Sequence, residues 1–309
     1  MLNNLRRKRV QRLDIESRDE FNGIWWFKDL LVYGVQCSNL GNQRYSKKKK
    51  KQSFDHYRLK RHLIPYCRAN DEIYNMILCP SGSFWKESNN TQDSNPLEEM
   101  KIEKPFLLGE TEITHELYYS VVNQNPNWYG YNPKNPVAKV SWYDALRFCN
   151  RLSDMFGLEH YYVIGNGQNI FLDGYGNKET HYPVKTNGNS KGFRLPTEWE
   201  WKYAAKAGRD LKYSGSNNAD EVGWHNGNSD KTTHPVKERN PNAWGFYDMS
   251  GNVWEWCENT YNLEDKSISA ARVFLGGGWA TSIENFLVKR FSSPIWYSSE
   301  IGFRVCRYL

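Results

Sequence analysis

The sequence contains no pair of closely spaced cysteines. Its six cysteines are scattered along the chain, and no two of them are separated by only two residues. This spacing excludes the usual zinc-ribbon and dithiol redox motifs, in which two neighbouring thiols act together. We therefore expect reduced thiols at all six positions, which are Cys37, Cys67, Cys79, Cys149, Cys257 and Cys306.

Long apolar runs are also missing. No stretch approaches the roughly 20 apolar residues that a membrane-spanning helix needs. The start, MLNNLRRKRVQRLD, is basic but is not followed by an apolar segment, so it lacks the pattern of a secretory signal. We expect no transmembrane segment and, by default, a cytoplasmic location, with export by another route left open.

Aromatic residues are abundant instead. They make up 15% of the 309 residues, with 13 Trp and 20 Tyr, although the mean hydropathy is only -0.80. A flat ring buries a large area and has few torsions to freeze, so such residues favour β-rich cores and contact surfaces. The composition predicts a water-soluble fold with many aromatic contacts.

Positive charge is concentrated near the N-terminus. Residues 1–70 contain 17 Lys and Arg against 6 Asp and Glu, whereas the net charge of the whole chain is +6. Runs such as KKKKK at 47–51 favour disorder or an anion-binding tail. We divide the chain into a basic segment, 1–72, which is partly disordered or docking, and a folded domain, 73–309. The basic segment is either a solvated tail or a site for nucleic acid or an anionic surface.

Helix punctuation is clear at two places in the folded domain. One predicted helix begins with a cap at Ser141 and ends at Gly157, and the other begins at Thr197 and ends at Gly208. Asn- and Gly-rich loops and short aromatic strands follow, and the terminal IGFRVCRYL alternates like a single strand. This pattern predicts an α+β domain with few helices, short strands and many ordered loops.

Seven segments of this domain carry motifs in a fixed order. They are MILCPSGSFWKES, GETEITHELYYSVV, VSWYDALRFCNRLS, RLPTEWEWKYAAKAG, PNAWGFYDMSGNVWEWCEN, RVFLGGGW and IGFRV. Together they resemble the formylglycine-generating enzyme (sulfatase-modifying factor) domain family. The resemblance covers residues 73–309 and implies a C-type-lectin-like fold. Within it, Arg194 and Arg304 are interpreted as buried hydrogen-bonding forks.

The resemblance implies a copper-dependent oxidase that converts a cysteine of a sulfatase to formylglycine. Such enzymes hold Cu(I) with two cysteines, five residues apart, that follow the Gly-Gly segment. Matching GGGWATSIENF to that pattern places Thr281 and Phe286 at the two positions. A hydroxyl and a phenyl ring cannot replace the soft sulfur ligands that Cu(I) prefers. Copper is therefore not expected, and the oxidase is the disfavoured alternative.

The resemblance also implies a calcium site in the GNxWEW segment. Its ligands here would be the carboxylates of Asp248 and Glu255 and the backbone carbonyls of Gly251 and Val253. Hard oxygen ligands of this kind suit Ca²⁺. The alternative is a buried turn in which Glu255 bonds to backbone amides. Structural calcium is thus a candidate cofactor.

The last forty residues further resemble the variable proteins of diversity-generating retroelements. Those proteins keep the frame RGGSW…SP…IGFRV and vary the residues between, which bind ligand. The candidate ligand-binding residues here are Thr281, Phe286, Lys289, Phe291, Ile295, Trp296, Tyr297 and Ser298.

Trp, Tyr and Phe on an ordered loop are typical of contact surfaces. We therefore predict a non-catalytic protein that presents residues 280–300 to a protein or glycan. The alternative is that these aromatic side chains serve ordinary core and loop packing.

Overall fold

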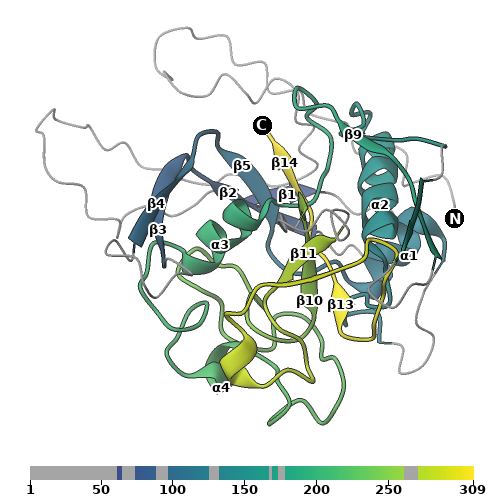
Figure 1. Cartoon of the computed structure of the whole chain (residues 1–309). Helices are drawn as coiled ribbons and strands as arrows, with labels where there is room; N and C mark the ends of the chain where they lie inside the picture. Colours follow the sequence, from purple (N-terminus) through teal and green to yellow (C-terminus); the bar gives the residue numbers. More distant parts are fainter. Residues whose placement is uncertain are drawn as a thin grey trace, which may run out of the picture. The chain divides into compact units, whose positions relative to one another are not determined.

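The computed structural model describes residues 61–64, 74–87, 97–124, 132–166, 169–172, 178–260 and 271–309 (Figure 1). Most of the basic segment, 1–72, lies outside these residues. The predictions that it is partly disordered or docking, and that it binds nucleic acid or an anionic surface, therefore remain predictions. No helix in the described part of the chain is long and apolar enough to cross a membrane.

The described domain contains short strands and few helices, as predicted. The helices are α1 (His115–Val122), α2 (Trp142–Met155), α3 (Glu198–Lys206), α4 (Ala219–Val222) and the 3₁₀ turn η3 (Ile283–Asn285). The strands are β1 (Arg61–Ile64), β2 (Tyr74–Cys79), β3 (Gly82–Glu87), β4 (Leu97–Ile102), β5 (Phe106–Gly109), β6 (Tyr162–Ile164), β7 (Asn169–Leu172), β8 (Lys178–His181), β9 (Val184–Thr186), β10 (Trp254–Thr260), β11 (Arg272–Leu275), β12 (Arg290–Ser292), β13 (Ile301–Gly302) and β14 (Cys306–Tyr308). This composition confirms the predicted α+β class.

Two four-stranded sheets form the centre of the domain. The first has the order β1-β2-β5-β14 and the second β12-β11-β10-β13. Pairs β3-β4, β6-β9 and β7-β8 form small separate ribbons. Strand β1 lies within residues 1–72, so the first sheet extends into the segment that the sequence analysis set apart. Strand β12 is an edge of the second sheet, which leaves one of its sides without a strand partner in that sheet.

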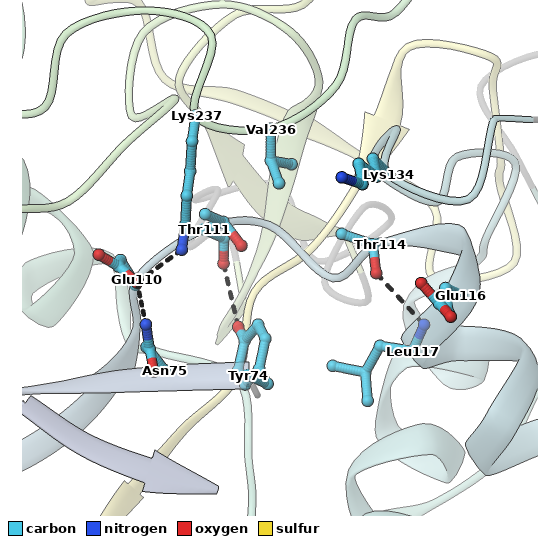
Figure 2. A pocket seen from close by; sticks show the side chains of 10 residues that line it. All are labelled: Tyr74, Asn75, Glu110, Thr111, Thr114, Glu116, Leu117, Lys134, Val236 and Lys237. Atoms are coloured by element: carbon cyan, nitrogen blue, oxygen red, sulfur yellow. Dashed lines mark hydrogen bonds and ion pairs between the residues drawn. The ribbon is translucent and has the colours of Figure 1, made fainter. Parts of the chain in front are cut away.

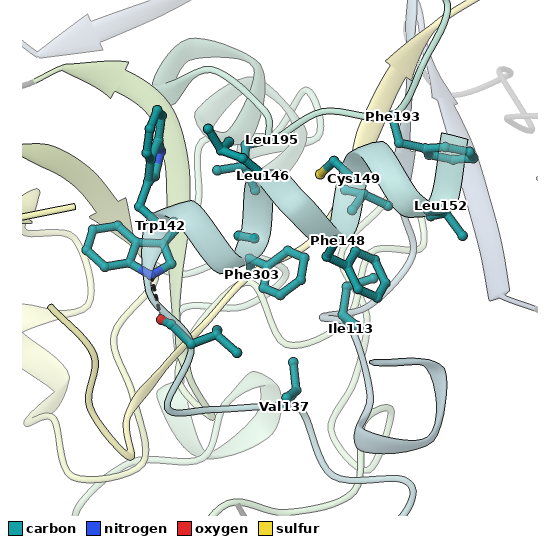
Figure 3. Packing of buried hydrophobic residues seen from close by; sticks show 14 of the residues in the cluster. Ile113, Val137, Trp142, Leu146, Phe148, Cys149, Leu152, Phe193, Leu195 and Phe303 are labelled. Atoms are coloured by element: carbon teal, nitrogen blue, oxygen red, sulfur yellow. Dashed lines mark hydrogen bonds between the residues drawn. The ribbon is translucent and has the colours of Figure 1, made fainter. Parts of the chain in front are cut away.

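Helix α2 forms where the sequence predicts it. The Ser141 side chain accepts a hydrogen bond from the backbone N–H of Asp144, and the Asp144 carboxylate accepts one from the Ser141 N–H. This reciprocal cap satisfies donors that a helix start otherwise leaves unpaired. The apolar face of α2 packs into the main core, where Trp142, Phe148 and Cys149 are fully buried (Figure 3). The chain then leaves the helix through Gly157, at φ 64°.

Helix α3 begins with the same device at Thr197 and Glu200. Glu200 has a second role, because its two carboxylate oxygens accept hydrogen bonds of 2.7 and 2.6 Å from the guanidinium of Arg194. Arg194 is fully buried, which confirms the prediction of a buried fork. The helix ends at Ala207, in a left-handed conformation, and Gly208 follows with φ 69°.

The two helices cover opposite faces of the second sheet. Trp254, Trp256 and Phe274 share a cluster with the α2 side chains. Val273 and Leu275 instead share a cluster with Trp201, Tyr203 and Ala204 of α3. Because side chains alternate along a strand, β10 and β11 are buried on both faces. Apart from the exposed end of β10 at Thr260, the edge strand β12 and the loops beside it carry the exposed surface of this sheet among the described residues.

The C-terminal segment differs from the predicted single strand. Residues 301–302 pair with β10 in the second sheet, and residues 306–308 pair with β5 in the first. Between them, Phe303, Arg304 and Val305 are all fully buried. The alternating pattern is therefore not that of one half-exposed strand. The segment crosses from one sheet to the other, and the crossing places a charged side chain in the core.

Candidate functional site

The glycine segment forms a tight turn directly after β11. Gly276 and Gly277 have φ values of 99° and 80°, a region that residues with a side chain rarely adopt. A Cβ atom added to Gly277 would overlap the ring of Phe286. Gly276 also accepts a 2.8 Å hydrogen bond from the Gly251 N–H. The glycines therefore allow close packing of two loops and leave no open space for a ligand at this point.

Both positions that the oxidase would need for sulfur serve the fold. The Thr281 hydroxyl accepts a 2.9 Å hydrogen bond from the Gly278 N–H, and its residue is 9% exposed. Phe286 is 4% exposed and belongs to a small cluster with Tyr213, Ala219 and Val222. The Phe286 ring is buried under the glycine turn and is not part of an exposed surface, so a role for it as a ligand anchor stays a prediction. The Thr281 hydroxyl is likewise used for a hydrogen bond within the protein.

The remaining predicted residues differ in exposure. Phe291, Trp296 and Tyr297 are exposed, at 39, 42 and 61%. Lys289 is half-buried, and its Nζ lies 3.3 Å from a carboxylate oxygen of Glu198 in α3. Ile295 packs against the main core, and Ser298 accepts a 2.9 Å hydrogen bond from the Lys139 N–H through its backbone carbonyl. The exposed aromatics are therefore the accessible part of the predicted set.

Two exposed residues were missed by sequence reasoning. Leu287 and Val288 are 62 and 41% exposed, in the turn between η3 and β12. Short aromatic strands are predicted for this part of the chain, and Leu287 and Val288 are not among the candidate ligand-binding residues. The strand begins only at Arg290. A signal was present in the sequence: four apolar residues among the six of FLVKRF exceed what a short edge strand can bury.

One of the exposed aromatic side chains, Trp296, packs on the core. The Trp296 ring stacks on Phe274, with 5.9 Å between the ring centroids and 24° between the planes. Phe274 in turn contacts Trp254 and Trp256 edge-on. The preceding Pro294 accepts a 3.1 Å hydrogen bond from the Trp142 N–H. Such contacts restrict the orientation of the Trp296 ring.

The predicted residues lie on two sides of β12. Phe291 pairs with Val273, whose side chain packs toward α3. Arg290 pairs with Phe274 on the other side, and its guanidinium lies 5.9 Å from the Trp254 ring centroid. Because neighbouring residues of a strand point to opposite faces, Phe291 and Trp296 approach the edge from different sides. The candidate surface therefore wraps around the edge strand.

The predicted calcium turn contains a buried carboxylate with an unused oxygen. Asp248 has φ 57° and is 2% exposed. Its Oδ2 accepts a 2.9 Å hydrogen bond from the Lys237 N–H, while Oδ1 has no hydrogen-bond partner. Burial raises the pKa of Asp248 to about 6. A buried oxygen of this kind is chemically suited to a cation.

Glu255, the second predicted ligand, is already paired. Its Oε1 and Oε2 each accept a 2.6 Å hydrogen bond from Arg304, and Oε2 accepts another of 2.6 Å from Trp201 Nε1. Both members of the ion pair are fully buried, which confirms the buried fork at Arg304. The alternative in which Glu255 bonds to backbone amides is wrong, because its partners are side chains.

A third carboxylate near this turn was not predicted. Glu112 Oε1 accepts a 3.3 Å hydrogen bond from the Val253 N–H, and burial together with the charge of Asp248 raises the pKa of Glu112 well above its usual range. The donor set thus fits a calcium ion in part: Asp248 offers a free oxygen, but Glu255 is already neutralised by Arg304. Calcium binding through Asp248, Gly251, Val253 and Glu255 remains a prediction.

The described cysteines are not arranged for chemistry. Cys79, Cys149, Cys257 and Cys306 are free thiols, and all are buried. Burial raises the pKa of each of them above its usual range, which disfavours the reactive thiolate. Within the described residues, no group of three or more His, Cys, Asp or Glu side chains could hold a metal ion.

Comparison with known proteins agrees with this architecture. The family model of the sulfatase-modifying factor enzyme 1-like domain matches residues 64–309. The chaperone protein LppX of Paenibacillus barcinonensis is 32% identical over 228 residues, 67% of this chain and 79% of that protein. Inactive C-alpha-formylglycine-generating enzyme 2 of Bos taurus is 30% identical over 140 residues, 37% of this chain and 44% of that protein.

Solved structures agree as well. The structure of Treponema denticola variable protein 1 has a TM-score of 0.66 and 30% identity, and the match covers 81% of this chain and 99% of that one. This likeness and the family match confirm the predicted C-type-lectin-like α+β fold. The chain belongs to the family of sulfatase-modifying factor enzyme 1-like domains, the formylglycine-generating enzyme family.

Proposed function

We propose that the chain is a non-catalytic binding protein whose exposed C-terminal surface contacts a protein or glycan. One observation carries this proposal. Nine large hydrophobic side chains are exposed among the described residues, and five of them lie within residues 287–297. We call these five the C-terminal surface: Leu287, Val288, Phe291, Trp296 and Tyr297. Such a concentration is typical of interaction sites, whereas single exposed apolar residues are ordinary.

The absence of sulfur at two positions supports a non-catalytic role. Thr281 and Phe286 stand where the oxidase holds Cu(I), and both are used for internal bonding and packing. Two relatives are consistent with this, since one is described as an inactive formylglycine-generating enzyme and the other as a variable protein. Their names describe those proteins and support the proposal here only by analogy.

The chemistry of the surface favours a large partner. Trp and Tyr supply most of the binding free energy at many interfaces, with about 2 kcal/mol or more for each central residue. Trp296 is held by its stack on Phe274, so little side-chain entropy is lost when a partner covers it. Arg290, exposed on the same edge strand, adds a cation beside the apolar side chains. A sugar ring or a protein side chain would stack on such rings.

The proposal is tested with a crosslinking amino acid at position 288 in the native host. Crosslinked proteins are identified by mass spectrometry, and the purified chain is applied to a glycan array. A double variant, Trp296→Ala with Tyr297→Ala, should abolish binding of whatever partner is found.

The matched control carries Trp85→Ala and Tyr119→Ala, which remove an exposed Trp and an exposed Tyr from β3 and α1. Both double variants should keep the far-ultraviolet spectrum of the wild type. Equal loss of binding in the two double variants, or unchanged binding in the first, would refute the assignment of the C-terminal surface.

A further inference from the structure

A pocket lies apart from the C-terminal surface. It has a volume of about 330 Å³ and is bordered by the start of β2, the β5–α1 connection and two loops near residues 134 and 237 (Figure 2). Its size is near the lower end of the range of about 300–1,000 Å³ that small-molecule sites occupy. Five of its ten lining residues belong to the segment GETEITHELYYSVV, and none belongs to the C-terminal surface.

The pocket carries charges of both signs. Its acidic side chains are Glu110 and Glu116, and its basic side chains are Lys134 and Lys237. Hydroxyl groups, one amide and two aliphatic side chains complete the lining, from Tyr74, Asn75, Thr111, Thr114, Leu117 and Val236. The lining is therefore polar, electrically balanced and only partly apolar.

One half of the pocket is preorganised. Glu110, whose side chain is 2% exposed, accepts hydrogen bonds of 2.8 Å from Lys237 Nζ and 2.7 Å from Asn75 Nδ2 (Figure 2). The Lys237 backbone has φ 71°, and its N–H is held by Asp248. A positive φ at a residue other than glycine costs conformational energy. Such backbone strain is often found where a side chain must be placed for function.

The same wall has an acceptor that the protein does not use. The Oδ1 atom of Asn75 is buried and has no hydrogen-bond partner, although the Nδ2 atom of the same amide is bonded to Glu110. Leaving a buried acceptor unpaired costs free energy unless a bound group supplies the donor. An N–H group of a ligand would satisfy it.

The other half of the pocket lies at the start of α1. The first backbone N–H groups of this helix are already bonded: those of His115 and Glu116 to the carbonyls of Asn135 and Pro133, and that of Leu117 to the Thr114 hydroxyl. An anion would therefore have to be held by lysine side chains and not by the helix end. Lys134 borders this half, and its backbone carbonyl accepts a 3.0 Å hydrogen bond from the Val236 N–H.

These observations decide the ligand class. A ligand with only negative charge would meet two lysines but also two carboxylates in this lining, and a purely positive ligand would meet the reverse. A small molecule with an ammonium at one end and a carboxylate at the other avoids both conflicts. We propose that this pocket binds a small zwitterion, a free α-amino acid or a short peptide of similar size.

In this arrangement the ligand's ammonium donates to Glu110, Glu116 or the free Asn75 oxygen. Its carboxylate accepts from Lys134 and Lys237. The side chain of the ligand lies against Leu117 and Val236, which leaves room for a small residue only.

The test uses the purified full-length chain and free L-amino acids, added singly at millimolar concentration and measured by calorimetry and ligand-observed NMR. At least one should bind. Its N-acetyl and carboxamide derivatives, which each lack one charge, should bind at least about tenfold more weakly, since each loses a charged hydrogen bond. If either derivative binds as tightly as the amino acid, the ligand need not be a zwitterion and that assignment is wrong. If no amino acid binds, the proposal that this pocket binds one is wrong.

Variants locate the site. Glu116→Gln and Lys134→Gln should each weaken binding by about tenfold, whereas Glu99→Gln and Lys101→Gln, which change exposed charges on β4, should not. The pair Trp296→Ala and Tyr297→Ala should leave amino-acid binding unchanged, so failure of one proposal does not imply failure of the other. Binding that is unaffected by both pocket variants would place the ligand elsewhere.

Discussion

Phe286 and Gly277 offer a sharp test of how the glycine turn is built. Phe286 is 4% exposed, and its ring meets Tyr213 and His225 edge-on, with centroid distances of 6.0 and 5.9 Å. Truncating a buried Phe to Ala removes its burial and leaves a cavity, which costs about 3–5 kcal/mol. We therefore expect Phe286→Ala to lower the free energy of unfolding by about 3–4 kcal/mol.

Gly277→Ala is expected to be costly for two reasons. Its φ of 80° is unfavourable for Ala by about 1–2 kcal/mol, and the new Cβ overlaps the Phe286 ring. When Phe286 is already Ala, the overlap disappears and only the backbone cost remains. The two substitutions should therefore be non-additive, with a coupling of about 1 kcal/mol or more.

Equilibrium unfolding in urea measures all four proteins of this cycle. Phe291→Ala is the matched control, because it removes the same side chain from an exposed position on β12 and should cost less than about 1 kcal/mol. The reasoning is refuted if Phe286→Ala costs no more than this control. Strict additivity of Gly277→Ala and Phe286→Ala would show that the ring does not lie over the glycine.

Three further predictions concern buried charges. Arg304→Met should lower the free energy of unfolding by about 3–5 kcal/mol, because it leaves the Glu255 carboxylate buried without its cation; a loss below about 1 kcal/mol in urea unfolding would contradict this. Calcium should raise the melting temperature of the wild type in calorimetry but not that of Asp248→Asn, and an equal effect on both would exclude the turn as the site. Burial raises the pKa of Glu258 above its ordinary 4.5, so its contribution to stability is present at low pH and is lost as the pH rises through the folded-state pKa. In thermal melts at increasing pH, the melting temperature of Glu258→Gln should therefore rise relative to that of the wild type as the pH rises above 4.5. A difference in melting temperature that falls over this range would contradict the prediction.

The parts of the fold that sequence reasoning predicted are those set by local chemistry. The caps at Ser141 and Thr197 are fixed within four residues, so their signal is complete in the sequence. The family motifs added the order in which these local units are assembled.

The features that sequence reasoning missed have a common physical cause. Phe286 looks like its exposed neighbours in the sequence, and its burial depends on Tyr213 and Val222, more than 60 residues earlier. The terminal IGFRVCRYL alternates, but its two halves join different sheets, and Arg304 between them pairs with Glu255 in the core. Both outcomes rest on contacts between distant segments, and no local pattern records them.

The structure separates the residues between the glycine turn and the C-terminus into two groups with different constraints. Phe286 and Arg304 are packed or paired in the interior, so their replacement changes stability. Leu287, Trp296 and Tyr297 are exposed, and substitutions at exposed positions usually change stability by no more than about 0.5 kcal/mol. Trp296 stacks on Phe274, and the backbone just before it is bonded to α2 through Pro294 and Trp142, so the backbone beside Trp296 is anchored to the core. The exposed side chains of this surface can therefore change while the fold stays the same, which is a property that an active site with fixed metal ligands does not have.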